Sequence, residues 1–574
     1  MNSTLFRIVT AVAALLLASQ SASAQIVWNV NYSDSNGQGF NDTTILSGSL
    51  TVGQARRDSV TAALDYLSTV LDGRGTVNLN FGVSGTTTNN NTEPLASFGP
   101  QQYVDVTNSS LPGSFQNGGV YHSARTNTQV FDGSPDASGS FNFGYGWNYV
   151  GQTTNSNNYD MVTVAIHEIA HGAGFLSVIR SDGRGLFDDS TGQPNAYSGL
   201  DRHLQRGNGT GGSLFNTDIT SSGYASFTGQ VSTLTNGNDA TTGLFFGGKY
   251  AREVSGGAVP MYAPSPFEPG SSLGHVVDTN AVMNPDITPN TVRRFQRYEI
   301  AMLLDIGWNV YNWDNATGNW NDGIGSNGSL DVTASNWRTD AGIVFINGSH
   351  YNIQSHQGQA PVLAPYGQVT SNLVLNFGGA AAYTATNDLG TLRLARLNLD
   401  SSATAASAIA NAAASPDAEL VFGVNSDGTA SALAPAIRQD GAGDFAVSAH
   451  VRTTDTTSAP GGGWAGLDVA GSGAGRLTLS GRVAGTGGLT KAGAFTLELA
   501  GGQANTVAGA TTVRAGTLVL NKAPGADAVG GTLVVEGGAV VLAAADQLPS
   551  AAGRSVVLAG VTLSTGDGLS LIHI

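Results

Sequence analysis

The sequence predicts an α+β domain followed by an all-β, solenoid-like C-terminal region. Two observations lead to this fold class. Near the start of the chain an amphipathic helical pattern lies between two strand-like patterns, and near its end short apolar strands recur between glycine-containing turns. A chain of 574 residues is also too long for one ordinary core, so we expect each region to fold around its own core.

The composition favours an extracellular, β-rich protein. Charged residues make up 11% of the chain, against roughly 25% in an average soluble protein, and 78 residues are glycine. The formal net charge is -16 and no basic cluster is present, so nucleic acid is not an expected partner. Because the chain contains no cysteine, a metal site would have to use histidine and carboxylate ligands.

Residues 1–24 have the three parts of a secretory signal peptide. Arg7 precedes an apolar stretch from Ile8 to Ala18, and the small-x-small sequence Ala22-Ser23-Ala24 follows. The apolar stretch is too short to cross a bilayer, so we expect export and cleavage before Gln25. No other segment approaches ~18 uninterrupted apolar residues, and no transmembrane helix is expected.

Residues 25–310 are expected to form the α+β domain. Ile26–Tyr32 alternates like a strand, Val52–Leu71 carries apolar residues at helical spacing, and Thr76–Val83 alternates again. Aromatic residues from Phe141 to Tyr149 predict a further strand. This strand would lie either in the core or at an exposed sheet edge, where a peptide could bind by adding itself as another strand.

Two further regions are expected beyond residue 310. Residues 311–470 should form a β-rich spacer, and residues 471–574 a region of short strands whose coils stack edge to edge. The predicted strands are Leu477–Leu479, Phe495–Leu499, Gly516–Leu520 and Gly531–Val535. A glycine-rich linker is the alternative, because strand-like alternation is a weak signal. Leu569–Ile574 breaks the pattern abruptly, which predicts a truncated C-terminus.

One stretch of the C-terminal region resembles a known repeat. Gly485–Gly493 followed by Gly509–Leu518 is similar to the β-strand repeat in passenger domains of bacterial autotransporters. The resemblance implies a passenger that is secreted or displayed on the surface of a Gram-negative cell. Such passengers are normally followed by an outer-membrane translocation barrel, which this chain does not contain. We expect the protein to be a monomer.

The most specific motif lies in a helix predicted to begin after Asp160, which can serve as its N-cap. His167 and His171 are four residues apart, so both rings project from one helical face and can bind the same ion. Neutral imidazoles are typical zinc donors, and Glu168 between them can act as general base on a water molecule. The alternative is a pair of core histidines bound to backbone carbonyls.

A catalytic zinc site needs a third protein ligand and an open position. The candidates in this chain are His275 and, as an alternative metal ligand, Asp201, since carboxylates also bind zinc. His203 is expected to lie at the surface or behind the ligands. Near His275 the sequence Val282-Met283-Asn284-Pro285 can form a turn, although Met283 alone is equally typical of a core.

Together these blocks resemble the leishmanolysin-like branch of the metzincin zinc peptidases. In that branch the third histidine follows an insertion and shortly precedes a methionine-containing turn. The resemblance implies a metzincin-like zinc peptidase domain with Glu168 as general base. It also implies that the zinc ligands are His167, His171 and His275, and that the Met-turn residue is Met283. The chain departs from the family pattern in lacking every cysteine and in having a longer insertion.

The expected function is therefore hydrolysis of peptide bonds by a secreted or surface-exposed zinc-dependent endopeptidase. Its expected partners are protein or peptide substrates. An alternative is a surface adhesin or structural passenger with an inactive metallo-domain. The presence of Glu168 together with a complete set of candidate ligands argues against that alternative.

Overall fold

The computed structural model divides the chain into two compact units, one built mainly from Ile26–Asn312 and the other mainly from Leu363–Ile574. The described residues are 26–73, 75–85, 93–101, 103, 115–126, 133–185, 197–210, 212–216, 226–313, 317–320, 337–338, 344–346, 349–351, 370–425, 428–459, 462–548 and 555–559. The predicted signal peptide at residues 1–24 and the predicted break at Leu569–Ile574 lie outside them.

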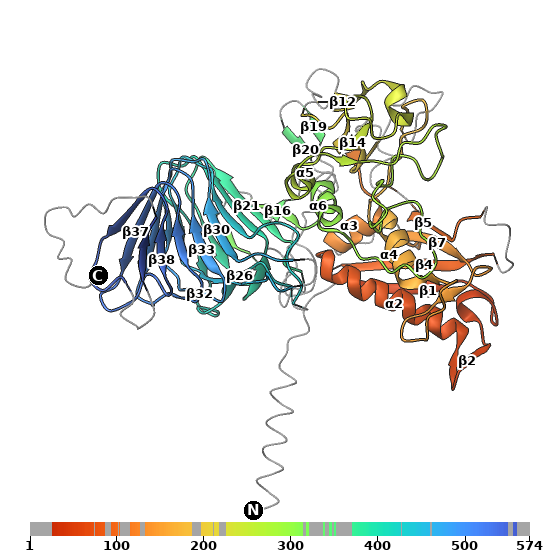
Figure 1. The fold of residues 1–574 in the computed structure, drawn as a ribbon, viewed down its shortest axis with the longest axis horizontal. Coiled ribbons are helices and arrows are strands. Elements are labelled where there is room, and N and C mark those ends of the chain that lie inside the picture. Colours follow the sequence, from red (N-terminus) through yellow and green to blue (C-terminus); the bar gives the residue numbers. More distant parts are fainter. Residues whose placement is uncertain are drawn as a thin grey trace, which may run out of the picture. The chain divides into compact units, whose positions relative to one another are not determined.

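The N-terminal unit is a mixed α/β structure, as the sequence predicts, and its largest sheet has four strands (Figure 1). In sheet order these are β1 (Val27–Tyr32), β4 (Thr76–Gly85), β7 (Ala137–Asn142) and β5 (Ala96–Pro100). β1, β4 and β7 are parallel, whereas β5 runs antiparallel to β7. β5 therefore forms one edge of this sheet.

The two faces of the sheet differ in polarity. Along β4, Val77, Leu79 and Phe81 are buried, while the residues between them are partly exposed. Because side chains alternate across a strand, the apolar residues share one face and asparagines share the other. On the polar face the Asn29 amide donates to the Asn78 side chain over 2.7 Å.

Five α-helices are described, all in this unit: α2 (Val52–Val70), α3 (Gly119–Thr126), α4 (Met161–Gly172), α5 (Lys249–Ser255) and α6 (Arg297–Ile306). α2 packs against α4, and α4 packs against β5 and β7. The predicted helix at Val52–Leu71 is confirmed. It begins where the Thr51 hydroxyl accepts from the Gln54 amide over 3.1 Å, which satisfies a free N–H of the first turn.

The remaining elements of this unit are short. They are η1 (Gly39–Asn41), β2 (Ile45–Ser47), β3 (Leu50–Thr51), β6 (Phe115–Gln116), β8 (Trp147–Asn148), β9 (Tyr159–Asp160), β10 (Tyr197–Ser198), η2 (Asp201–His203), β11 (Leu204–Arg206), β12 (Phe215–Asn216), β13 (Ser226–Phe227), η3 (Val231–Thr235), β14 (Leu244–Phe246) and β15 (Val259–Pro260). Among the described helices, none combines the length and apolar composition needed to cross a membrane.

The predicted strand from Phe141 to Tyr149 is wrong as a single element. β7 ends at Asn142, whose side chain accepts from the Gly144 amide over 3.0 Å and turns the chain, and β8 is a separate short strand. Phe141 is fully buried, and β7 lies between β4 and β5. The sequence predicts this segment to be either a buried core strand or an exposed sheet edge. Its first part, β7, is a buried core strand, and the edge of the sheet is β5.

The C-terminal unit consists of long parallel β-sheets and is consistent with a β-solenoid (Figure 1). The first sheet contains β21 (Val374–Gly379), β24 (Arg396–Ser401), β27 (Ala436–Gln439), β30 (Gly466–Ala470), β33 (Gly488–Lys491), β36 (Thr511–Val513), β38 (Leu533–Val535) and β40 (Val556–Leu558). The second contains β17 (Gly318–Asn319), β22 (Thr384–Asn387), β25 (Ser407–Asn411), β28 (Phe445–Val447), β31 (Leu477–Leu479), β34 (Thr496–Gly501), β37 (Thr517–Lys522) and β39 (Ala539–Leu542).

The third sheet contains β23 (Leu392–Leu394), β26 (Glu419–Phe422), β29 (His450–Thr453), β32 (Val483–Gly485) and β35 (Thr506–Val507). From β21 to β35 the chain visits the three sheets in turn, so every third strand adds to the same sheet. Four further strands are β16 (Val310–Trp313), β18 (Trp337–Arg338), β19 (Val344–Ile346) and β20 (Ser349–Tyr351).

Apolar ladders run through this stack. Leu375, Leu397, Ile437 and Val469 are register partners on successive strands of the first sheet, and all are buried. The parallel stacking is thus already present at β17 and β21, well before Leu477, the start of the first predicted repeat strand.

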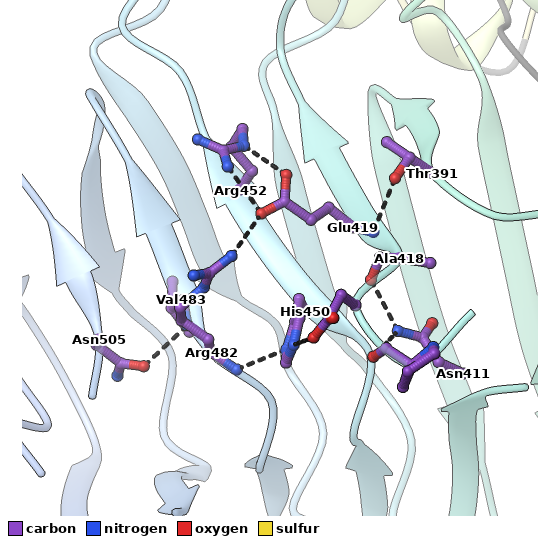
Figure 2. Close-up of polar contacts among 11 residues, drawn as sticks. Thr391, Asn411, Ala418, Glu419, His450, Arg452, Arg482, Val483 and Asn505 are labelled. Atoms are coloured by element: carbon purple, nitrogen blue, oxygen red, sulfur yellow. Dashed lines mark hydrogen bonds and ion pairs between the residues drawn. The ribbon is translucent and has the colours of Figure 1, made fainter. Parts of the chain in front are cut away.

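Polar side chains also bind from coil to coil (Figure 2). The Glu419 carboxylate on β26 accepts from Arg452 on β29 over 2.6 and 2.8 Å, and from Arg482 over 3.1 Å. His450 Nδ1 accepts from the backbone amide of Arg482 over 3.0 Å. Glu419 thus binds an arginine on the next strand of its sheet, Arg452, and one beside the strand after that, Arg482, so the cluster joins three coils.

Candidate metal centre

Helix α4 positions the first two candidate ligands, and the predicted helix is confirmed. Its N-cap is Asp160, whose carboxylate accepts from the Thr163 amide over 2.7 Å and from the Thr163 hydroxyl over 2.6 Å. His167 and His171 follow one turn apart on the same face. The rest of the helix is apolar and buried, so packing of α4 holds the two rings in place.

The chain leaves α4 through a sharp turn that depends on Gly174. This residue has φ +102°, a left-handed conformation that favours glycine. The turn brings the Phe175 carbonyl back to the helix end, where it lies 2.7 Å from His171 Nδ1. The local sequence after the helix therefore orients one of its own histidines.

The structure brings His167, His171 and His275 together. The Nε2 atom of His167 lies 3.1 Å from Nε2 of His171 and 3.1 Å from Nε2 of His275. Among the residues that the structure describes, these three form the only histidine or carboxylate group whose ligand atoms could hold one metal ion. Two nitrogens about 2.1 Å from a shared tetrahedral ion lie about 3.4 Å apart, so the observed spacing fits such an ion.

The other ring nitrogens fix the tautomers. His167 Nδ1 lies 2.7 Å from the Val282 carbonyl, His171 Nδ1 2.7 Å from the Phe175 carbonyl, and His275 Nδ1 2.7 Å from the Ser271 carbonyl. A carbonyl only accepts, so each Nδ1 carries the proton and donates it. All three Nε2 atoms therefore present lone pairs to one point, where they repel one another unless a cation lies between them. The donor set fits a metal ion.

Burial keeps these imidazoles neutral. It lowers the pKa of His171 to about 4 and that of His275 to about 3, and it holds the pKa of His167 well below the usual value of 6.5. The neighbouring rings lower the pKa of His167 and His275 further. Neutral imidazole is the form that binds a metal, so the rings need not lose a proton first.

Glu168 lies beside the cluster and is buried, with 7% of its surface exposed. Burial raises the pKa of Glu168 to about 8, and the Phe98 amide of β5 opposes that rise by donating to its carboxylate. A cation held by the adjacent histidines would also lower this pKa. The carboxylate belongs to the helix that packs against the edge strand β5, and it lies outside the histidine group.

The segment around Met283 is held by a carboxylate that the sequence analysis did not identify. Glu299 on α6 accepts from the Met283 amide over 2.8 Å and from the Val282 amide over 3.3 Å. It also accepts from the Gln296 amide over 2.7 Å and so completes a capping box. The Gln-x-x-Glu spacing could have indicated the capping box. Met283 itself is fully buried.

The other sequence candidates have different partners. Asp201 is fully buried, and its carboxylate accepts from the Val178 amide over 3.2 Å and from the Ser198 amide over 2.9 Å. It therefore stabilises the loop after α4 and is not part of the histidine group. His203 is half-buried, and its Nε2 donates to the Asp305 carbonyl over 2.8 Å.

Comparisons with family models, curated proteins and solved structures find no match for this chain. What the site can do chemically is therefore given by its own geometry. Three neutral imidazoles can hold a cation, and a buried carboxylate next to them can accept and return a proton.

Proposed function

We propose that this protein is a zinc-dependent endopeptidase of the leishmanolysin-like branch of the metzincins. The observation that carries the proposal is the convergence of three Nε2 lone pairs, each fixed by a carbonyl on Nδ1, beside a buried glutamate. Histidine ligands whose second nitrogen is bound to a carbonyl are typical of zinc sites. Peptides are the substrate class favoured by the edge strand next to the site.

Zinc bound by His167, His171 and His275 would supply a Lewis acid that lowers the pKa of water and polarises a carbonyl. Glu168 takes a proton from the attacking water at its carboxylate and later returns it to the departing amine. The backbone of Phe98 opposes the rise in the pKa of Glu168 and so favours the carboxylate form that accepts the proton. Burial of Glu168 favours uptake of the proton from water, because a neutral carboxylic acid is more stable than the anion in an apolar site.

β5 is the element that favours a peptide over other substrates. It forms the edge of the described four-stranded sheet and contacts α4, which carries Glu168. An extended peptide can bind such an edge by main-chain hydrogen bonds without regard to its side chains. Such a peptide would lie along Ala96–Pro100, on the strand that contacts α4.

The parallel stack of the C-terminal unit supports an extracellular setting. Stacked coils of this kind, together with the signal-like residues 1–24 and the autotransporter-like repeat, favour export to the outer surface of a Gram-negative cell. The same stack also favours the second candidate function, a surface adhesin whose metallo-domain is inactive.

Glu168→Gln separates the two candidates. The variant keeps all three histidines but cannot accept the proton, so we expect zinc content to be unchanged and casein hydrolysis to fall by about 10²–10⁴-fold. Zinc is measured by atomic absorption, with Glu253→Gln on α5, an exposed glutamate, as the matched control. Equal hydrolysis by Glu168→Gln and wild type would reject the mechanism. No hydrolysis by zinc-loaded wild type would favour the adhesin.

A further inference from the structure

A cavity of about 510 Å³ lies directly beside the histidine cluster. His171 forms part of its wall, and the other walls come from β5, from the loop after α4 and from the segment that precedes His275. Pockets that hold ligands commonly have volumes of about 300–1,000 Å³, so this one has room for several side chains of a peptide. It begins at the candidate reaction centre.

Most of the cavity wall is uncharged. Apolar lining residues are Phe98, Pro100, Leu176, Val178, Ile179 and Phe267. Of the described residues that line the cavity, Arg180 is the only one with a permanent charge. A single cation on a wall that otherwise carries no permanent charge can select a ligand group of the opposite charge.

The Arg180 side chain is exposed and has no ion-pair or hydrogen-bond partner among the residues that the structure describes. Its backbone is fixed, because its amide donates to the Arg184 carbonyl over 2.7 Å and its carbonyl accepts from the Gly183 amide over 2.9 Å. The guanidinium therefore projects from an ordered turn and is free to bind an anion.

The carboxylates that flank the lining segments have other partners. Asp182 lies 3.6 Å from the Arg184 guanidinium, and Glu268 accepts from the Tyr262 hydroxyl over 3.0 Å. Neither side chain lines the cavity. Among the residues that the structure describes, no carboxylate pairs with Arg180, in a chain whose formal net charge is -16.

We propose that this cavity binds the part of a peptide substrate next to the scissile bond, and that Arg180 selects an acidic side chain there. The inference rests on the proposed peptidase function and names the substrate class of the same site. Arg180 is a specificity-determining residue with no part in the proton transfer. A guanidinium binds a carboxylate through two parallel N–H groups, which favours glutamate and aspartate over neutral side chains of the same size.

The test uses pairs of fluorogenic peptides that differ only in glutamate or glutamine at one position on either side of the scissile bond. For zinc-loaded wild type we expect kcat/KM about fivefold higher for the glutamate peptide at the selected position, which corresponds to ~1 kcal/mol for a solvent-exposed ion pair. Arg180→Ala should abolish the ratio, and Arg180→Glu should invert it. Both variants should still cleave the glutamine peptide measurably, so that the ratio between the two peptides can be determined for each.

Arg184→Ala is the matched control, because Arg184 belongs to the same turn but pairs with Asp182 and does not line the cavity. It should keep the wild-type ratio. A ratio of one in wild type at every position, or a ratio that survives in Arg180→Ala, overturns the inference while leaving the peptidase function intact.

Binding provides a readout that does not depend on hydrolysis. Fluorescence anisotropy with the same peptides and the zinc-loaded full chain should show tighter binding of the glutamate peptide, and raising the salt concentration should weaken that preference. If wild type cleaves nothing but still binds the glutamate peptide about fivefold more tightly through Arg180, the proposed function fails and the acidic subsite stands. Equal binding of both peptides rejects the subsite.

Discussion

The two units bury polar groups in opposite ways. In the N-terminal unit the Nε2 atoms of His167, His171 and His275 face one another as lone pairs, and no hydrogen-bond donor of the described residues lies among them. In the C-terminal unit the buried ammonium of Lys491 donates to three backbone carbonyls, over 2.8–3.1 Å. The histidine cluster leaves its Nε2 acceptors without donors, whereas the donors of the Lys491 ammonium all have acceptors.

The difference separates a cluster that could bind a ligand from a group whose hydrogen bonds are complete within the fold. Buried polar groups are costly unless they are bonded, so a cluster of acceptors without donors is one that could hold a cation. Lys491 occupies a position in an aliphatic ladder, between Val469 and Val513, yet its hydrogen bonds are complete. Buried charge by itself is therefore no sign of function in this protein.

Removing one acceptor of the metal cluster should have the largest effect. A structural zinc site provides about 10–16 kcal/mol from four ligands, so each ligand contributes about 2.5–4 kcal/mol. We expect His275→Ala to weaken zinc binding a few hundredfold, as measured by competition with a chelator. Asp201→Asn should leave zinc affinity near that of wild type, because its carboxylate is bonded to the Val178 and Ser198 amides.

His203→Ala is the control for loss of a histidine that lies outside the cluster. His203 donates to the Asp305 carbonyl, and its replacement should lower stability without changing zinc affinity. A larger loss of zinc in Asp201→Asn than in His275→Ala would assign the third ligand to Asp201 and remove the contrast between the two units.

A pH titration tests the C-terminal unit. Burial lowers the pKa of Lys522 from 10.5 to about 8, and its ammonium donates to the Gly481 carbonyl. Between pH 8 and 10.5 the unfolded chain holds a proton that the folded protein has lost, so stability rises with pH in this window. At 1.36 kcal/mol per pKa unit, the rise due to Lys522 is at most about 3 kcal/mol.

The measurement is the free energy of unfolding of the full chain in urea at pH 7 and 10.5, for wild type and Lys522→Met. The variant should lack the part of the rise that Lys522 contributes. Lys491→Met is the informative comparison, because it leaves three carbonyls without their donor and should be less stable than wild type at pH 7. The same pH dependence in wild type and Lys522→Met would contradict the prediction.

Local periodicity was enough to predict the helices that carry the fold. The apolar spacing at Val52–Leu71 and the N-cap Asp160 gave α2 and α4 nearly to their ends. The full extent of the parallel stack could not be predicted in this way. In the later coils, register partners are equally spaced along the chain, from Leu489 to Thr511 to Leu533. Between the earlier partners Arg396 and Ala436 the spacing is much longer, because loops lengthen the coil. These loops hide the repeat in the sequence.

The site was predictable only in part, for a similar reason. His167 and His171 share a helix, so their spacing fixes their geometry, whereas the approach of His275 depends on the tertiary fold. The role of β5 was missed because nothing in its short sequence marks it as a sheet edge. Glu299 was missed because its contacts with Val282 and Met283 join distant segments.

Replacing Glu299 should have the smallest effect on zinc affinity, and it tests whether this buried carboxylate supports the histidine cluster or only the fold. Its carboxylate holds the Val282 amide, and the Val282 carbonyl in turn accepts from Nδ1 of His167. In Glu299→Gln the side-chain NH₂ must face at least one of the three backbone N–H groups that the carboxylate now accepts, so the Val282–Met283 segment should shift. Loss of a group that orients a metal ligand typically costs about 10–100-fold in affinity, and we expect about tenfold for this more remote one.

The readout must separate this positioning role from simple capping of α6. Zinc affinity of the full chain should fall in Glu299→Gln, and the fall should exceed that in Glu268→Gln, an exposed control in the same unit. If Glu299→Gln lowers only the melting temperature and keeps wild-type zinc affinity, Glu299 is a helix cap alone. The three histidines would then be oriented only by the carbonyls that accept from their Nδ1 atoms. The buried carboxylate of Glu299, like the ammonium of Lys491, would stabilise the fold without affecting the cluster.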